Sequence, residues 1–433
     1  MYLDFCSYIG KGWETMKITK QGTKILFDGI PTYSDIQGSN PACHGLMMNM
    51  RMIQGVFDDK EDVSRFNRYG KTFCPEQNTE ELIASLPAWY AHGIRAITVG
   101  FQGGGPCFTL DNYTIQNSPY SEDGMSMDEA YLRRMKRIIL AADAIGMVVI
   151  VSLFYGAQTR FLKDDDAVYA AVKTASNFLR DEQFTNVIIE IANEYDITCF
   201  NRHPVLHTPK GIVYLIEVAQ RESGGMYVGC SGTGGHFNEE ICKASDIILI
   251  HGNDNGRQRV YNLIEKCKQI KPARPIVINE DSQALGNMAM AVDSYVSWGY
   301  YNNMTKQEPP TYWEITKGED EFFALRTSEM LGLTENKLSL EDQFYLQGLE
   351  SHMTYDGKRW IRLASLYPEK ILCVAFYRNG EFVGKAWDDP FMLNSVGSNW
   401  LQMAFPEEIK TGETWKAVIT LVTGETVEKT ATV

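Results

Sequence analysis

The chain has 433 residues, of which 44% are hydrophobic and 22% charged, enough to build a large core in one or more globular domains. Its formal net charge of -14 repels phosphate backbones, so we expect no nucleic-acid partner. No apolar run reaches the roughly 18–20 residues of a membrane span, and we expect no membrane partner.

Residues 1–40 are expected to form an N-terminal extension, in which "MKITKQGTKILFDGIPTYSD" predicts a hairpin packed on the following domain. From about residue 45, short apolar runs alternate with longer amphipathic stretches. The expected strands are residues 45–54, 94–100, 147–154, 186–193, 226–230, 247–251, 275–280 and 297–301. The expected helices are residues 79–92, 128–145, 164–180, 209–222, 258–270 and 288–296.

Eight strands, most followed by a helix, predict a parallel sheet with helices outside it. Eight such units within residues 41–350 are typical of a (β/α)8 TIM barrel, an α/β fold. A doubly wound open sheet is the main alternative. It would normally carry a glycine-rich phosphate turn after its first strand, whereas the first strand here leads into "GVFDD".

Residues 353–433 have a different pattern. Apolar and polar residues alternate with period two, and turn residues stand at 378–380 and 423–424. This pattern predicts a C-terminal antiparallel β unit of about 80 residues, a size that suits an immunoglobulin-like β-sandwich.

Two of the predicted barrel strands end in a glutamate. "NVIIEIANE" carries Glu194 at the end of the fourth strand, and "RPIVINED" carries Glu280 at the end of the seventh. Barrel enzymes place their chemistry at these strand ends, and strands four and seven face each other across the mouth. A glycosidic bond needs one protonated and one ionised carboxyl group, and burial with mutual repulsion separates two nearby pKa values. The pattern therefore predicts a glycoside hydrolase.

The arrangement resembles clan A of the glycoside hydrolases, retaining (β/α)8 families with an acid/base Glu after an Asn on strand four and a nucleophile Glu on strand seven. Asn193, Glu194 and Glu280 match these positions, and "RMIQGVFDD", "DAIGMVVIVSLFYG" and "VSWGYYNN" are similar to cellulase-like members. The resemblance covers about residues 40–330. It implies cleavage of a β-linked glycoside, oligosaccharide or polysaccharide without a cofactor. Tyr195 replaces a common Pro and His251 a common Tyr, which leaves the sugar open.

Other polar and aromatic side chains at predicted strand ends are candidates for sugar binding. Amides, imidazoles and carboxylates bond hydroxyl groups, and aromatic rings stack on the C–H faces of sugars. Each candidate could instead be a satisfied rim or core residue. The predicted substrate-binding residues are Asn193, His251, Trp298, Gln102, Asp58 and Tyr195.

Glu190 shares strand parity with Glu194 and should point into the barrel, where a buried charge needs a partner. We expect Arg51 to be that partner, in a structural role. No metal is expected, because Pro204 separates His203 from His207 and argues against a regular helix face with ligand spacing.

Two other functions stay open at this point. A carbohydrate-binding barrel without turnover is the first alternative, although a decayed enzyme commonly loses one carboxylate and both are present here. The second is another barrel enzyme, which would need a His/Asp cluster or a Schiff-base Lys. If Met1 is the natural start, the absence of a signal-like segment and the odd count of nine Cys predict a cytoplasmic protein, and otherwise a secreted one. The oligomeric state is left open.

Overall fold

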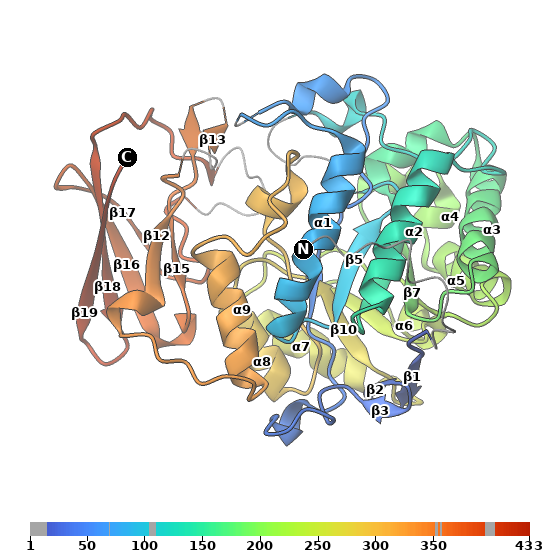
Figure 1. The fold of residues 1–433 in the computed structure, drawn as a ribbon, viewed down its shortest axis with the longest axis horizontal. Coiled ribbons are helices and arrows are strands. Elements are labelled where there is room, and N and C mark those ends of the chain that lie inside the picture. Colours follow the sequence, from blue (N-terminus) through green and yellow to red (C-terminus); the bar gives the residue numbers. More distant parts are fainter. Residues whose placement is uncertain (1–14, 69, 104–109, 351–353, 356, 395–402) are drawn as a thin grey trace.

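The computed structural model describes residues 15–68, 70–103, 110–350, 354–355, 357–394 and 403–433. Figure 1 shows a larger α/β part and, beside it, a smaller part made of the C-terminal strands. None of the helices in these ranges is both long enough and apolar enough to cross a membrane.

The larger part is built on eight parallel strands, each of which overlaps one of the eight predicted apolar runs. Six form one sheet in the order β11-β4-β5-β6-β7-β8, and β9 pairs with β10. Val277 of β10 bridges in parallel to Ser297, just before β11, and Asp246 N–H donates to Val228 C=O between β9 and β8. The fold is therefore a TIM-barrel-like α/β fold. The strands are β4 (Asn49–Arg51), β5 (Ala96–Gly100), β6 (Val148–Tyr155), β7 (Val187–Asn193), β8 (Tyr227–Gly229), β9 (Ile248–His251), β10 (Ile276–Glu280) and β11 (Gly299–Tyr300).

Helices surround this sheet, and all six predicted helices are present. Their ends follow local capping chemistry: the Asp128 side chain accepts the Ala130 N–H at one helix start, and Gly146 takes a positive φ of 79° after that helix ends. The helices are α1 (Pro75–Ala91), α2 (Glu129–Asp143), α3 (Asp165–Asp181), α4 (Pro204–His207), α5 (Pro209–Glu222), α6 (Glu239–Ala244), α7 (Arg257–Lys268), α8 (Leu285–Asp293) and α9 (Glu319–Met330).

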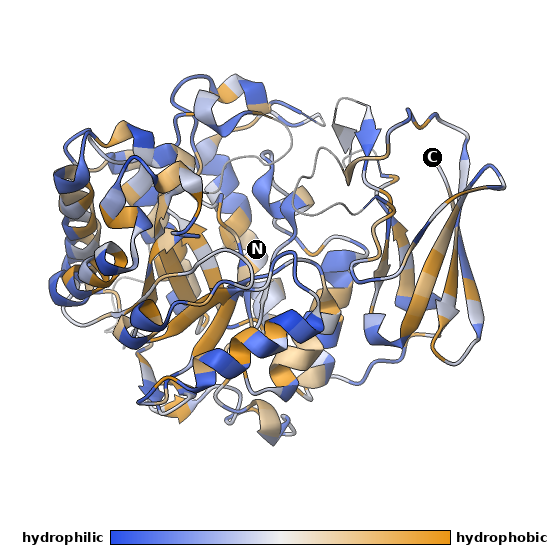
Figure 2. Cartoon of the chain, turned by 180° about the vertical axis from the view of Figure 1, so that it is seen from behind, coloured by the Kyte–Doolittle hydropathy of each residue, from blue (hydrophilic) through white to orange (hydrophobic). Residues whose placement is uncertain are grey.

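The core lies on both faces of the parallel strands, which are strongly apolar in Figure 2, while the surrounding helices carry hydrophilic outer faces. Alternate residues point inward, so that Val148 and Ile188 meet residues of the N-terminal hairpin. Ile18 and Ile25 of that hairpin pack in this inner cluster and cover one end of the barrel. The hairpin strands are β1 (Ile18–Gln21), β2 (Lys24–Phe27) and β3 (Ile30–Pro31).

The C-terminal part is an antiparallel β unit, as its period-two pattern predicts. Four strands pair in the order β17-β16-β18-β19, and Asn379 and Gly380 take positive φ values at the predicted turn. Phe405 and Trp415 pack edge to face in a separate core, with ring centroids 5.1 Å apart. The strands of this part are β12 (Phe344–Gln347), β13 (Thr354–Tyr355), β14 (Lys358–Arg359), β15 (Arg362–Ser365), β16 (Ile371–Arg378), β17 (Glu381–Ala386), β18 (Thr414–Leu421) and β19 (Thr426–Thr432).

Buried polar contacts join the two parts. Arg362 of β15 forms an ion pair with Glu319 at the start of α9, with Nη2 2.6 Å from Oε2, and both side chains are buried. Asp389, after β17, accepts the backbone N–H of Gly286 in the first turn of α8 at 2.8 Å. The C-terminal part therefore neutralises a buried charge of the barrel and satisfies a helix end beside strand β10.

Candidate active site

Glu194 follows β7, whose seven residues are all buried. A run of β-branched and apolar residues fills the strand, and the carboxylate comes where the strand ends. Glu194 has a φ of 56°, in the left-handed region that non-glycine residues rarely adopt, and its C=O accepts the N–H of Ile197 in a tight turn. This turn brings the side chain to the mouth of the barrel, where it is 22% exposed.

Glu280 ends β10 on the other side of the mouth. The pairing of β10 with β9 shifts register between Ile278 and Glu280, so that Glu280 lies opposite His251. Such an irregularity re-aims the side chains around it. Glu280 Oε1 accepts the Asn253 Nδ2–H at 2.7 Å, and Oε2 lies 2.6 Å from Arg51 Nε.

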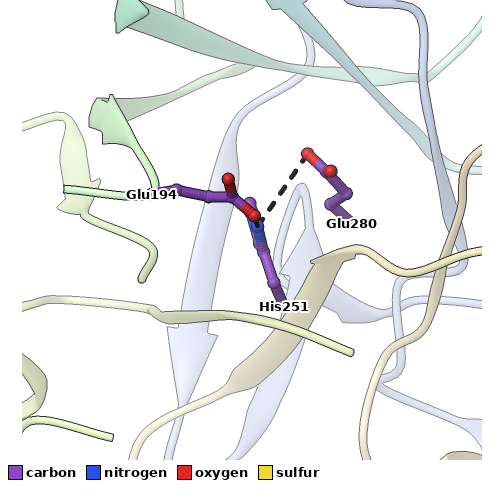
Figure 3. A group of neighbouring side chains, drawn as sticks. All are labelled: Glu194, His251 and Glu280. Atoms are coloured by element: carbon purple, nitrogen blue, oxygen red, sulfur yellow. Dashed lines mark hydrogen bonds and ion pairs between the residues drawn. The ribbon is translucent and has the colours of Figure 1, made fainter. Parts of the chain in front are cut away.

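The two carboxylates face each other with His251 beside them (Figure 3). One oxygen of Glu194, one oxygen of Glu280 and a ring nitrogen of His251 all lie within 4.8 Å of one another. His251 Nδ1 is 3.3 Å from Glu194 Oε1 and 3.9 Å from Glu280 Oε2. The Glu280 side chain is only 8% exposed. A small group could therefore lie between one enclosed carboxylate and one more open carboxylate.

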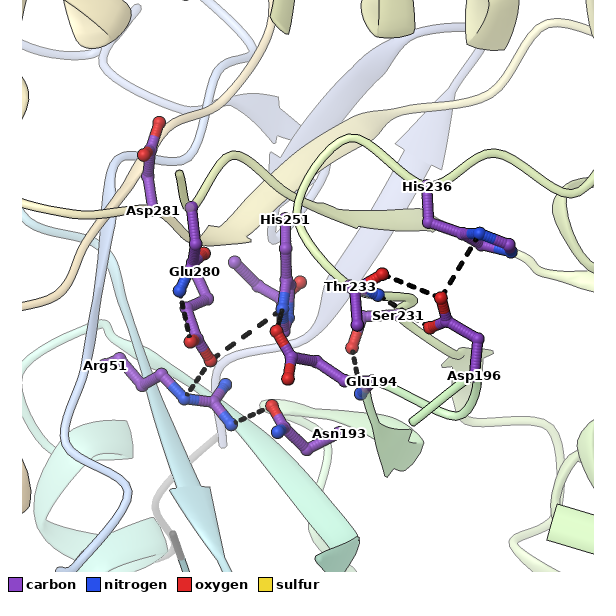
Figure 4. Close-up of polar contacts among 12 residues, drawn as sticks. Arg51, Asn193, Glu194, Asp196, Ser231, Thr233, His236, His251, Glu280 and Asp281 are labelled. Atoms are coloured by element: carbon purple, nitrogen blue, oxygen red, sulfur yellow. Dashed lines mark hydrogen bonds and ion pairs between the residues drawn. The ribbon is translucent and has the colours of Figure 1, made fainter. Parts of the chain in front are cut away.

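Two buried cations balance the carboxylates of this cluster. Burial alone would lower the pKa of His251, but the charge of Glu280 and the contacts with Glu190 and Glu194 outweigh it and raise the pKa to about 10. Arg51 is also fully buried. At neutral pH His251 and Arg51 are both cations. They lie beside Glu194 and Glu280 (Figure 4), and both also lie within 4 Å of Glu190.

Glu190 is the anion beneath the site. Burial raises its pKa, yet the contact with His251 and the charge of Arg51 outweigh burial and lower the pKa to about 2. Arg51 Nη1 lies 3.8 Å from Glu190 Oε2, which confirms the predicted partner. Arg51 is closer still to Glu280, a contact that the sequence did not predict.

Glu280 is subject to opposing effects. Burial raises the pKa of its carboxyl group, Arg51 and His251 oppose that rise, and the charge of Glu194 adds to it. The negative charge of Glu194 therefore disfavours the ionised form of Glu280.

The Glu194–His251–Glu280 cluster has the composition of a metal site. Arg51 Nε already lies 2.6 Å from Glu280 Oε2, so a neighbouring cation neutralises this carboxylate. The donor set fits an ion-pair network better than a metal centre.

Two predicted binding residues lie at the carboxylates. His251 is part of the Glu194–His251–Glu280 cluster, and Asn193 contacts Arg51, which pairs with Glu280. Asn193 Oδ1 accepts a hydrogen bond from Arg51 Nη2 at 2.5 Å, which fixes the direction of the amide. His251 lies between the carboxylates and is fully buried, so it contacts the predicted catalytic groups rather than an open sugar-binding surface.

Trp298 and Gln102 are not the sugar-binding groups that the sequence predicted. Trp298 has 0% exposure, and its Nε1–H donates to Asp281 Oδ2 at 2.9 Å, so the ring offers no face for stacking. It lies where the pleat turns it toward the outer core, against Phe323. Gln102 is also fully buried and bonds Ser118 and the Tyr155 N–H.

Asp58 and Tyr195 likewise have structural partners. Asp58 forms an ion pair with Arg134 of α2, 3.4 Å away, on the helical side of the barrel. Tyr195 is buried, and its hydroxyl lies 2.7 Å from His236 Nε2. Its ring is therefore not the open platform that we expected.

Several polar residues near the carboxylates were not predicted. Asn253 follows β9 by two residues, and its polar neighbours in "HGND" at a strand end were the available signal. Ser231 and Thr233 lie in the glycine-rich stretch "SGTGGHF", which is neither a P-loop nor a complete dinucleotide-binding pattern. Ser231 contacts Ala192, before Glu194, and Thr233 contacts Asp196, after it. The spacing of residues along the sequence does not reveal such long-range contacts.

Compared with known proteins, the chain matches no family model and no curated protein sequence. Similar solved structures include a glycoside hydrolase (11% identity, 90% of this chain and 95% of the other, TM-score 0.47) and a β-mannanase from the blue mussel Mytilus edulis (12%, 73% and 96%, 0.45). Bacteroides uniformis β-glucuronidase 2 is another (11%, 96% and 47%, 0.45). The chain spans about half the length of the β-glucuronidases it resembles. At this level of similarity, the function must be argued from the chain's own residues.

Proposed function

We propose that the chain is a retaining glycoside hydrolase of the clan A type, with Glu280 as nucleophile and Glu194 as acid/base. The observation that carries the proposal is the carboxylate pair at the ends of β7 and β10, with oxygens within 4.8 Å of each other. Retaining enzymes hold their carboxyl groups about 5–5.5 Å apart, whereas inverting enzymes leave about 6.5–9.5 Å for a water. An approach of one oxygen from each carboxylate to within 4.8 Å agrees better with the retaining class than with the inverting class. We further propose that the eight strands close into a barrel and that the C-terminal unit is immunoglobulin-like.

The surroundings of each glutamate support this division of roles. Glu280 is enclosed. It forms an ion pair with Arg51 and accepts a hydrogen bond from Asn253, and both contacts stabilise its ionised form against the effect of burial. Glu194 is the more exposed group and contacts the cationic His251. With Arg51 and His251 positive and Glu190 negative, the site supplies the positive charge that an ionised Glu280 needs.

The reaction proceeds in two steps. Glu280 attacks the anomeric carbon while the bond to the leaving oxygen breaks, and that oxygen takes the proton of Glu194. The resulting ester removes the negative charge of Glu280, and the proton transfer leaves Glu194 as a carboxylate. Glu194 takes a proton from a water that attacks the anomeric carbon, and the ester bond breaks to restore Glu280. Asn193, held by Arg51, donates its amide hydrogen to a sugar hydroxyl.

Dinitrophenyl β-glycosides of several sugars, including glucose, mannose and galactose, provide the first test. We expect hydrolysis of at least one, a mass increase on Glu280 with a fluorinated analogue of that substrate, and a loss on the order of 10²-fold or more in kcat for Glu280→Gln. Unchanged hydrolysis by Glu280→Gln would refute the assignment of Glu280 as the nucleophile. Tight oligosaccharide binding without cleavage, measured by calorimetry, would favour a carbohydrate-binding protein instead.

A further inference from the structure

The backbone at Glu194 is strained. Its φ of 56° places a glutamate in the left-handed region, where the Cβ crowds the backbone. The turn from Glu194 to Ile197 is closed by a single backbone hydrogen bond of 3.0 Å. Surrounding contacts must therefore hold this turn in place, and with it the direction of the Glu194 side chain.

Ser231 binds the start of the turn. The Glu194 N–H donates to Ser231 Oγ at 3.3 Å, and the Tyr195 N–H donates to Ser231 C=O at 3.1 Å. Ser231 is fully buried, and its hydroxyl hydrogen is directed to Glu190 Oε1 at 2.7 Å. Because that hydrogen is engaged with Glu190, a lone pair of Ser231 Oγ is available to the Glu194 N–H.

Asp196 binds the same segment from the other end of the turn. Its carboxylate accepts the N–H and the Oγ–H of Thr233, each at 2.7 Å, and lies 3.2 Å from His236 Nδ1 (Figure 4). The other ring nitrogen of His236 lies 2.7 Å from the Tyr195 hydroxyl. Asp196 is thus the point where three polar groups of residues 231–236 converge on the turn.

The segment 231–236 also contacts the strand end beside the nucleophile. The Gly235 N–H donates to the His251 C=O at 3.0 Å. Gly234 lies so close to Asn253 that a Cβ built on it would stand 2.0 Å from the Asn253 C=O. The segment therefore fits tightly between the turn of Glu194 and the residues that contact Glu280.

We infer that Asp196 is a positioning residue, which fixes the acid/base Glu194 relative to Glu280 by binding the segment 231–236 through Thr233 and His236. This inference rests on the proposed function. Asp196 contacts none of the three groups of the Glu194–His251–Glu280 cluster in the described contacts, so it acts through the backbone. If Asp196 is lost, the strained turn relaxes and the Glu194 proton is displaced from the leaving oxygen.

A displaced acid has a signature that a general loss of structure lacks. A dinitrophenolate leaves without protonation, whereas a simple phenolate or an alkoxide needs the proton from Glu194. The value of kcat/KM reports the first step, in which that proton is used. Loss of acid positioning therefore lowers kcat/KM selectively for the poorer leaving group.

The experiment compares kcat/KM for the dinitrophenyl and the unsubstituted phenyl glycoside of the same cleavable sugar. For Asp196→Ala and Asp196→Asn we expect a fall of about 10- to 100-fold with the phenyl glycoside, and less than about 3-fold with the dinitrophenyl glycoside. Thr233→Val, which keeps the backbone N–H and removes only the hydroxyl, should show the same selectivity at a smaller size. An equal fall with both substrates, or no fall with either, would overturn the inference.

Asp165→Asn is the matched control, because Asp165 also pairs with a histidine, His203, and a backbone N–H, that of Val205, away from Glu194. Asp165→Asn should leave kcat/KM unchanged for both the dinitrophenyl and the phenyl glycoside. If Asp196→Ala does not fold, as judged by thermal unfolding, Thr233→Val and Asp196→Asn decide the matter. Failure of the proposed function is separate, since it would appear as full activity of Glu280→Gln in an otherwise normal chain.

Discussion

Replacing Arg51 with methionine should destabilise the protein to an extent that depends on pH. Arg51 lies 2.6 Å from Glu280 and 3.8 Å from Glu190, and all three side chains are buried. Methionine fills similar space without the charge. Removing one partner of a buried ion pair costs about 3–5 kcal/mol, because the remaining charge is uncompensated.

Protonation of Glu280 limits the part of that cost that comes from its own unpaired charge. The pKa of Glu280 already lies above its ordinary value of 4.5, and loss of Arg51 raises it further. Keeping the carboxyl group protonated costs about 1.4 kcal/mol for each pH unit above its ordinary pKa of 4.5. The cost is therefore at most about 4 kcal/mol at about pH 7.5 and about 1.4 kcal/mol at about pH 5.5. The native variant binds one more proton than its unfolded state, so its stability falls as pH rises.

Chemical or thermal unfolding of the variant and the parent chain, at about pH 5.5 and about pH 8, measures this difference. Arg134→Met is the matched control. Arg134 is equally buried, but its partners Asp58 and Glu76 are partly exposed and can be hydrated when the cation is lost. We expect a smaller and nearly pH-independent loss there. An Arg51→Met deficit that is the same at both pH values would refute the charge-balance reasoning.

Three further predictions concern the same cluster. The pKa of His251 is raised to about 10, so its charge stabilises the fold fully below about pH 6.5 and progressively less as pH rises to about 10. The stability difference between His251→Gln and the parent, measured by thermal unfolding, should therefore shrink between about pH 6.5 and about pH 10. Asn253→Ala removes a donor to Glu280, and should lower kcat about 10-fold and move the acidic limb of the kcat/KM profile to higher pH. Trp298→Phe removes one donor to the buried Asp281, whose pKa burial raises to about 6, while the donors on Ser282 and Asn287 remain; it should cost about 1–3 kcal/mol with little change in KM. A large rise in KM would restore Trp298 as a sugar platform.

Most of the strands were predictable because they lie in largely apolar runs that end near a polar residue or a glycine. "NVIIEIANE" gave both the extent of β7 and the position of Glu194, and a parallel sheet places all such ends at one edge. The partnership of Arg51 with Glu190 followed from strand parity and the need to neutralise a buried charge.

Side-chain direction at the strand ends was not predictable in the same way. Trp298 comes just before a strand of two residues, and no pattern reveals which side of so short a strand faces the outer core. The left-handed backbone of Glu194 and the register shift before Glu280 are equally absent from the sequence pattern, because both depend on partners far along the chain. Ser231 and Asp196 are such partners, and only folding brings them together.

The contacts between the barrel and the C-terminal strands have a practical consequence for protein engineering. Arg362 neutralises Glu319, and Asp389 satisfies the first turn of α8, the helix that follows the Glu280 strand. A gene cut before β12 would leave a buried glutamate unpaired and that helix end open. The C-terminal unit is therefore not a cassette that can be removed or exchanged, and attempts to shorten the chain should preserve both Arg362 and Asp389.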